Sequence, residues 1–209
     1  MKHIFYKSLI ITFLFTGCGT QKTVIKRFYT LEQTDKLNIN RLNDTVQINA
    51  RCEVEDVFVY PAYSTRKIVF RDASHQIRYF EDHEWAVHPS EVLTRMTIDF
   101  LSAQNLFLKV SNRFWKHTPK YHVNTTIYKM EVVPTENRKN FTAHLEINFQ
   151  LTDAKTGLAI VNHFANRESE LETKNLNLLA ESISNLFYEE LEKFATKIKD
   201  ELSNREIGE

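Results

Sequence analysis

The sequence predicts an α+β domain, a two-layer sandwich in which two amphipathic helices cover one face of a mostly antiparallel sheet. Residues 141–152 alternate apolar and polar side chains without an error, which indicates a strand with one buried face. The turn sequence 153–157 and a predicted return strand at 158–164 follow at once, and consecutive hairpins imply antiparallel pairing. Residues 89–105 and 175–202 repeat apolar side chains at helical spacing, which predicts the two helices.

The chain begins with an export signal that ends in a lipoprotein cleavage site. Lys2 and Lys7 make a positive start, residues 8–15 are apolar, and two small residues precede Cys18. We predict that residues 1–17 are removed and that Cys18 becomes the lipidated first residue. A transmembrane helix needs about 20 apolar residues, which is more than this run supplies. A buried strand with an ordinary cysteine is the other alternative.

The composition limits what can follow the signal. Residues 18–27 are polar enough for a linker, and residues 28–209 have the length of one domain with its own core. Removing Lys2 and Lys7 from the 27 basic residues leaves 25 against 27 acidic ones. This balance gives no electrostatic footprint for nucleic acid and argues against a polybasic membrane patch. With Cys18 lipidated, no disulfide can form within the chain.

Short strands open the domain. Apolar residues alternate from 46 to 54, and Cys52 falls on the apolar face, which predicts a buried core residue rather than a reactive thiol. The phase of the alternation changes at residues 55–56, where one extra residue predicts a bulge. Residues 67–71 and 76–80 are joined by a short polar segment, and they predict a hairpin.

Longer elements follow. Pro89 occupies a favoured helix start, and the helix is predicted to run to residue 105. The apolar segment 106–110 and the alternation at 121–128 predict two strands ahead of the long hairpin. The apolar stripe of the helix at 175–202 indicates core packing, with a partner-binding or membrane-surface helix as the alternative. Its polar face is more acidic than basic, which disfavours a surface of anionic lipid.

Five segments in the first half carry a resemblance to a known family. An aromatic-aromatic-x-Leu segment follows the lipoprotein cleavage site, and a strand that ends in Pro-x-Tyr comes next. An Arg, an Ile-Val-x-Arg strand and a Trp before an amphipathic helix complete the order. The chain thereby resembles the ABC-type transport auxiliary lipoprotein family, which includes lipoproteins of the paraquat-inducible protein C type. The matching segments are residues 28–31, 57–63, 66–71, 77–80 and 85–86.

The resemblance implies a function and a partner. It implies a non-catalytic, lipid-anchored periplasmic subunit of an ABC-type system for phospholipid transport. Its partner would be a membrane-anchored protein with mammalian-cell-entry (MCE) domains that bridges the envelope. Membrane attachment would be through Cys18, and a homo-oligomer stays open. Gly19, in place of Asp, favours the periplasmic face of the outer membrane, with the inner membrane as the alternative.

Candidate partner contacts come from the aromatic residues, because exposed aromatics are typical interface anchors. We predict two such places, the segment at 60–63 and an acidic loop around Trp85. The alternative is that these aromatics only close the end of the sheet. The candidate contact residues are Tyr60, Pro61, Tyr63 and Trp85.

No segment carries the pattern of an active site. His83 and His88 are five residues apart, whereas a zincin motif needs a spacing of four, so we predict no metal site. Residues 64–67 and 155–157 match two motifs of penicillin-recognising enzymes, but the serine precedes a strand and the glycine serves a turn. The four glycines form no phosphate-binding loop. We therefore predict no cofactor and no enzyme activity.

Two other classes of function stay open. The first is a structural lipoprotein partner of an outer-membrane assembly complex, with no role in ABC transport. The second is a small periplasmic hydrolase, which would need a convergent polar pocket that the sequence does not indicate.

Overall fold

One sheet and two helices make up the part of the chain that the computed structural model describes, namely residues 25–32, 48–137 and 139–207. The predicted signal and Cys18 lie outside these residues. The strands are β1 (Arg27–Tyr29), β2 (Ile48–Val54), β3 (Phe58–Val59), β4 (Lys67–Ala73), β5 (Gln76–Trp85), β6 (Phe107–Ser111), β7 (Tyr121–Pro134), β8 (Phe141–Asp153) and β9 (Ala159–Glu170). The helices are α2 (Pro89–Ala103) and α3 (Leu176–Ile207).

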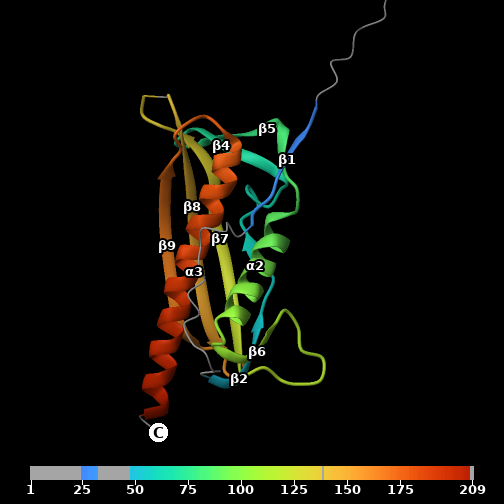
Figure 1. Cartoon of the computed structure of the whole chain (residues 1–209), viewed down its shortest axis with the longest axis vertical. Coiled ribbons are helices and arrows are strands. Elements are labelled where there is room, and N and C mark those ends of the chain that lie inside the picture. The colour runs from blue at the N-terminus through green and yellow to red at the C-terminus, as the bar shows by residue number, and fades with distance from the viewer. Residues whose placement is uncertain (1–24, 33–47, 138, 208–209) are drawn as a thin grey trace, which may run out of the picture.

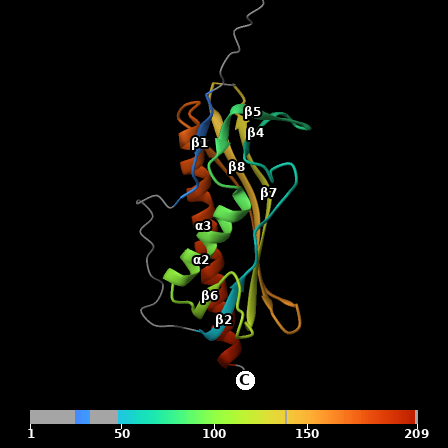
Figure 2. The same cartoon turned by 90° about the vertical axis from the view of Figure 1, so that its right-hand side faces the viewer.

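Both helices cover the same face of the sheet, as predicted (Figures 1 and 2). Helix α3 packs along β8 and β9, and α2 packs along β2, β3 and β6. The other face, called the open face below, has neither helix over it (Figure 2). The α+β class and the two-layer arrangement are thus confirmed. Neither described helix is long and apolar enough to cross a membrane.

The sheet is mixed, with long antiparallel ladders and short parallel ones. Strand β8 lies antiparallel between β7 and β9, and β4 and β5 form the predicted hairpin. Five further pairings are parallel: β1 with β5, β2 with β6, and β2, β3 and β4 with β7. Parallel neighbours are joined by long crossover connections, which leave no local signal. The prediction of antiparallel pairing is therefore confirmed for the ladders β7–β8, β8–β9 and β4–β5, whereas the parallel pairings were not predicted.

The predicted bulge at 55–56 lies between β2 and β3. Val54 pairs with Val123 of β7, and Phe58 pairs with Thr126 of the same strand. Four steps along one side of the ladder therefore match three steps along the other. The extra residue lets β2 and β3 follow the same neighbour while the chain changes phase.

The helix boundaries have local causes. The His88 side chain caps the first turn of α2, and Pro89 occupies the first position, where a missing N–H costs nothing. Helix α2 ends at Ala103, two residues earlier than predicted, and Asn105 beyond it takes a φ of 51°, a left-handed conformation common after helix ends. Helix α3 continues past the predicted boundary to Ile207.

Aromatic rings fill the space between α3 and β8. Phe149 of β8 is fully buried and stacks on Phe194 of α3, with ring centroids 5.3 Å apart. Phe187 lies about two turns before Phe194 on the same face of the helix, and its ring meets Phe149 edge-on with centroids 5.5 Å apart. Aromatic pairs in these geometries add to the free energy gained from burial alone.

A buried charged group fastens α3 to β9. Glu190 of α3 accepts hydrogen bonds from His163 at 2.8 Å and Lys193 at 2.7 Å, and Arg167 of β9 binds the same carboxylate. Burial raises the pKa of Glu190, but the bonds from Lys193, His163 and Arg167 outweigh it and hold the pKa below its usual range. The carboxylate is therefore ionised and fully partnered, which makes it a structural rather than a catalytic group.

Replacing Phe149 by Ala should lower the free energy of unfolding by about 3–5 kcal/mol, because it leaves a cavity beneath α3. Urea denaturation followed by circular dichroism measures the change. Phe164→Ala is the matched control, since this half-exposed ring on β9 points to the open face, and it should cost less than about 1 kcal/mol. Equal losses in the two variants would contradict the assigned core.

Candidate partner-binding face

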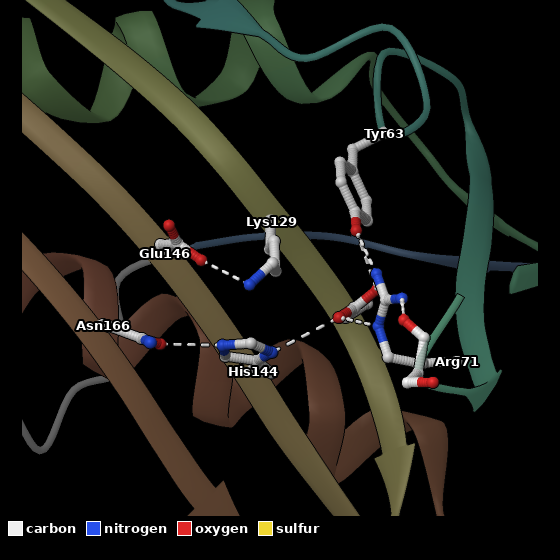
Figure 3. Close-up of polar contacts among 8 residues, drawn as sticks. Tyr63, Arg71, Lys129, His144, Glu146 and Asn166 are labelled. Atoms are coloured by element: carbon white, nitrogen blue, oxygen red, sulfur yellow. Dashed lines mark hydrogen bonds and ion pairs between the residues drawn. The ribbon is translucent and has the colours of Figure 1, made fainter. Parts of the chain in front are cut away.

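The open face is lined by the polar side chains that alternate with the core residues of β8. Ala143, Leu145 and Ile147 of β8 are fully buried under α3. The residues between them, His144 and Glu146, project to the other side of the sheet. A loop at 60–66 and strand β4 flank this side, so polar groups from distant parts of the chain meet here (Figure 3).

A second bulge, in β7, places the side chains of Lys129 and Glu131 on the open face. Ile127 pairs with Ile147 of β8, whereas Lys129 pairs with the adjacent Glu146, so one residue of β7 is extra. Before the bulge, the odd-numbered residues of β7 face the helices. After it, Lys129 and Glu131 face the open side instead.

Glu131 is the centre of a buried polar network, and Figure 3 labels its partners Tyr63, Arg71 and His144. Arg71 of β4 donates to it twice, from Nε to Oε1 at 2.6 Å and from Nη2 to Oε2 at 2.8 Å. The Tyr63 hydroxyl donates to Oε2 at 2.9 Å and itself accepts from Arg71 at 2.7 Å. The two bonds from Arg71 make a bidentate salt bridge, the strongest common geometry between arginine and a carboxylate.

His144 extends the network across the sheet to β9. Its Nδ1 lies 3.3 Å from Glu131 Oε1, and its Nε2 lies 2.7 Å from Asn166 Oδ1. Both partners are acceptors, so both ring nitrogens must donate, which is the bonding pattern of the imidazolium form. Lys129 and Glu146 form a further ion pair of 2.6 Å beside it (Figure 3).

These contacts fix the charges of the network. Burial raises the pKa of Glu131, but the hydrogen bonds from His144, Arg71 and Tyr63 outweigh it and lower the pKa to about 2. The bond to Glu131 raises the pKa of His144. Burial, together with the bond to Glu131, raises the pKa of Tyr63 to about 12. At neutral pH the carboxyl group of Glu131 is thus ionised, and Arg71, Tyr63 and His144 all bond to its oxygens.

A row of exposed aromatic rings crosses the open face beside this network. Tyr60 contacts Phe58 on one side and Tyr128 on the other, with ring centroids 5.8 and 5.2 Å apart. Tyr128, the residue at the bulge in β7, reaches Phe164 of β9 at 6.2 Å. Phe58, Tyr60 and Phe164 are each about half exposed. We call these four residues the aromatic row.

The structure separates the four predicted contact residues into two pairs. Tyr60 and Pro61 are exposed, as a contact residue must be. Tyr63 and Trp85 are only 6 % and 3 % exposed, so the expectation that they are exposed aromatics is wrong. Tyr63 turns inward because its hydroxyl belongs to the Glu131 network.

Trp85 is buried because the predicted acidic loop is a strand. Strand β5 runs through the acidic residues to Trp85, which pairs with Tyr29 of β1. The Trp85 carbonyl accepts a hydrogen bond from Arg66 Nε at 3.0 Å. The segment therefore closes the sheet, which is the alternative weighed for it in the sequence.

The other candidate groups have structural roles. His83 bonds to the Tyr29 hydroxyl at 2.7 Å, and His88 caps α2, so the two imidazoles serve different elements. No cluster of three or more potential metal ligands occurs in the described ranges. Cys52 is fully buried, which raises the pKa of its thiol far above the usual range. Gly157 has a φ of 70°, which explains the glycine of the turn after β8.

Replacing Glu131 by Gln should change how stability depends on pH. Because the pKa of Glu131 is lowered, its contribution is present above about pH 4.5 and is lost as the pH falls toward 2. The raised pKa of His144 adds stability below about pH 6.5 that is lost as the pH rises further. At about pH 5.5, Glu131→Gln should lower the free energy of unfolding by about 3 kcal/mol and flatten the acid limb.

Urea denaturation between about pH 3 and 8 measures both effects. Glu172→Gln, a change of the same kind at an exposed carboxylate, is the control and should leave the profile unchanged. An acid limb in Glu131→Gln as steep as in the original chain would contradict the assignment of charge to this network.

Comparison with solved structures shows the same fold. Protein XCC0632 from Xanthomonas campestris, assigned to the family DUF330, aligns with a TM-score of 0.70 and 10 % identity over 86 % of this chain and 99 % of its own. A protein described only as uncharacterized aligns with a TM-score of 0.66 and 14 % identity, over 83 % of this chain and 99 % of its own. No curated protein matches the sequence.

The sequence itself identifies the family. The family model described as the ABC-type transport auxiliary lipoprotein component matches residues 29–184, which run from the end of β1 through β9 and into the first part of α3. This match confirms the resemblance in the first half and extends it through the long hairpins. The chain belongs to the family of ABC-type transport auxiliary lipoproteins.

Proposed function

We propose that the chain is a non-catalytic subunit of an MCE-type ABC transport system that moves phospholipid across the envelope. In this proposal Cys18 anchors it at the periplasmic face of the outer membrane, and the open face docks an MCE-domain partner. Membership of the auxiliary lipoprotein family supports a role beside an ABC transporter. The MCE partner and the phospholipid follow from the resemblance to lipoproteins of the paraquat-inducible protein C type.

The aromatic row is the observation that carries the docking role. The row belongs to the open face, the side of the sheet that has neither helix over it in Figure 2. Three of its rings are about half exposed. A few residues provide most of the binding energy at protein interfaces, and Tyr is enriched among them because it buries much area at a small cost in entropy. Tyr60 lies at the middle of this row and was already a candidate contact in the sequence.

The Glu131 network supports the row by fixing its base. Tyr63, three residues after Tyr60, is bonded to both Arg71 and Glu131, and the Tyr79 hydroxyl holds the Ala62 carbonyl at 3.1 Å. The loop is thus held at two points next to the exposed ring. A surface held in its bound shape loses less entropy on association. The hydrogen-bonding groups of Glu131 and His144 are all bonded to other side chains. This arrangement supports a positioning role rather than a catalytic one.

Tethering makes a modest contact sufficient. A protein anchored at one membrane meets a partner at that membrane at a high effective concentration. The interface therefore does not need the area or affinity of a permanent complex. A small row of aromatic anchors on a rigid sheet is consistent with such a contact.

Removing two rings of the aromatic row should weaken binding of the partner. We expect the double variant Tyr60→Ser, Phe164→Ser to reduce recovery of the MCE-domain protein in detergent co-purification, with a loss of about 2 kcal/mol or roughly 30-fold in affinity. Leu158→Ser removes an exposed apolar side chain outside the row and should bind normally. Recovery of the MCE-domain protein at wild-type levels would contradict the docking face, and recovery of an outer-membrane β-barrel instead would contradict the transport role.

Changing Cys18 to Ala should release the protein from the membrane, because the thiol is the proposed site of lipid attachment. Fractionation of cells that express the full chain measures this, with the unchanged protein expected in the outer-membrane fraction. A Cys52→Ala variant is the matched control, since Cys52 is the other cysteine of the sequence and is buried. A Cys18→Ala protein that stays in the membrane fraction would contradict the anchor.

A further inference from the structure

Charge is distributed unevenly along a chain whose net charge is zero. From residue 100 to residue 130 the sequence contains no Asp or Glu, yet it contains five basic residues. Three of these lie in or next to the loop 112–120 between β6 and β7. The basic residues are Lys109, Arg113, Lys116, Lys120 and Lys129.

This loop, here called the tip loop, carries the most exposed large apolar side chain of the described residues. Trp115 is 84 % exposed, and Leu108 of β6, near the base of the loop, is about half exposed. The tip loop stands out from the body at the end of the molecule where α3 ends, far from β1 (Figure 1). An indole with nearly all of its surface in water lines no recess of its own chain.

Hydrogen bonds hold the tip loop in place. Asn112 Nδ2 donates to the Val54 carbonyl and to Asp56 Oδ1, both at 3.0 Å. The Phe114 N–H donates to Glu53 Oε2 at 3.0 Å. These contacts use the nearby carboxylates of β2 and its bulge at the base of the loop. Asp56 and Glu53 therefore lie at the base of the tip loop, and most side chains of the loop itself point to solvent.

The basic groups at the tip are not neutralised within the described residues. Arg113 lies over the Trp115 ring, with its guanidinium carbon 5.4 Å from the ring centroid, and Lys116 is exposed beside it. Neither forms an ion pair with another described residue. An exposed indole flanked by two cations that form no ion pair with another described residue is the combination expected at the headgroup level of an anionic bilayer.

We infer that the tip loop is a binding site for an anionic membrane surface. Trp115 inserts at the headgroup level, while Arg113 and Lys116 bind lipid phosphates. A protruding ring without a recess fits a fluid surface better than the shaped pocket in which protein hot spots usually lie. This site is separate from the open face, and it does not rest on the proposed partner.

Fluorescence of the full chain tests the inference, because its two tryptophans differ in environment. Trp85 is buried, so the difference between the original chain and Trp115→Phe reports Trp115 alone. With vesicles of phosphatidylglycerol and phosphatidylethanolamine, we expect the Trp115 emission to shift to shorter wavelength and to be quenched by brominated lipid. Vesicles of phosphatidylcholine should leave it unchanged. The readout is the environment of one ring, so attachment of the chain through another site does not by itself shift it.

Charge reversal at the tip separates the site from a general affinity for vesicles. Each of Arg113→Glu and Lys116→Glu should raise the lipid concentration at half-shift at least about fivefold, and added salt should do the same. Lys139→Glu makes the same change at the turn between β7 and β8 and should have no effect. An unshifted Trp115 on anionic vesicles, or an equal shift on phosphatidylcholine, would overturn the inference. Loss of an acidic protein partner in the tip variants, with no shift on vesicles, would assign the loop to that protein instead.

Discussion

The open face of the sheet depends on the buried carboxylate of Glu131. Four other groups converge on it or on its partners, and they come from the loop at 60–66, β4, β8 and β9. A buried charge is tolerated only when it is paired and fully bonded, so each of these segments is fixed by the need to satisfy this one group. Helices hold the opposite face through apolar packing. The open face is instead held by the hydrogen bonds and ion pair of Glu131. Because no helix packs on it, its aromatic rings stay exposed.

Local patterns in the sequence were enough to place most of the strands, both helices and the bulge at 55–56, because alternation and helical spacing record which face is buried. They missed β1 and the second half of β5. The parallel pairings and the Glu131 network were not predicted, since both join segments that lie far apart in sequence. A signal for the network was present: apolar residues of β7 change phase between Ile127 and Met130, and this second bulge turns Glu131 outward. Tyr63 and Trp85 were wrongly predicted to be exposed, because an aromatic residue among polar ones carries no local signal of burial. Tyr63 is buried by the hydrogen bond of its hydroxyl to Glu131, and Trp85 by the pairing of β5 with β1.

Net charge was a poor guide to the surface. The near balance of acidic and basic residues argued against a basic membrane patch, yet between positions 100 and 130 the chain has five basic residues and no acidic one. The structure places the centre of that stretch on a protruding loop and ties the nearest carboxylates down beneath it. Two different surfaces result, an aromatic row on a flat sheet and a basic tip with one bare indole. The first suits a protein partner, and the second suits a headgroup layer.

The central claim is that the open face, rather than the helical face, meets the transport partner. Site-specific photo-cross-linking in cells tests this most directly, with the cross-linking amino acid placed at Tyr60 on the open face or at Glu192 on the exposed side of α3. The account predicts a covalent adduct with an MCE-domain protein from position 60 and none from position 192. An adduct from position 192 alone, or none with an MCE-domain protein from either position, would contradict it.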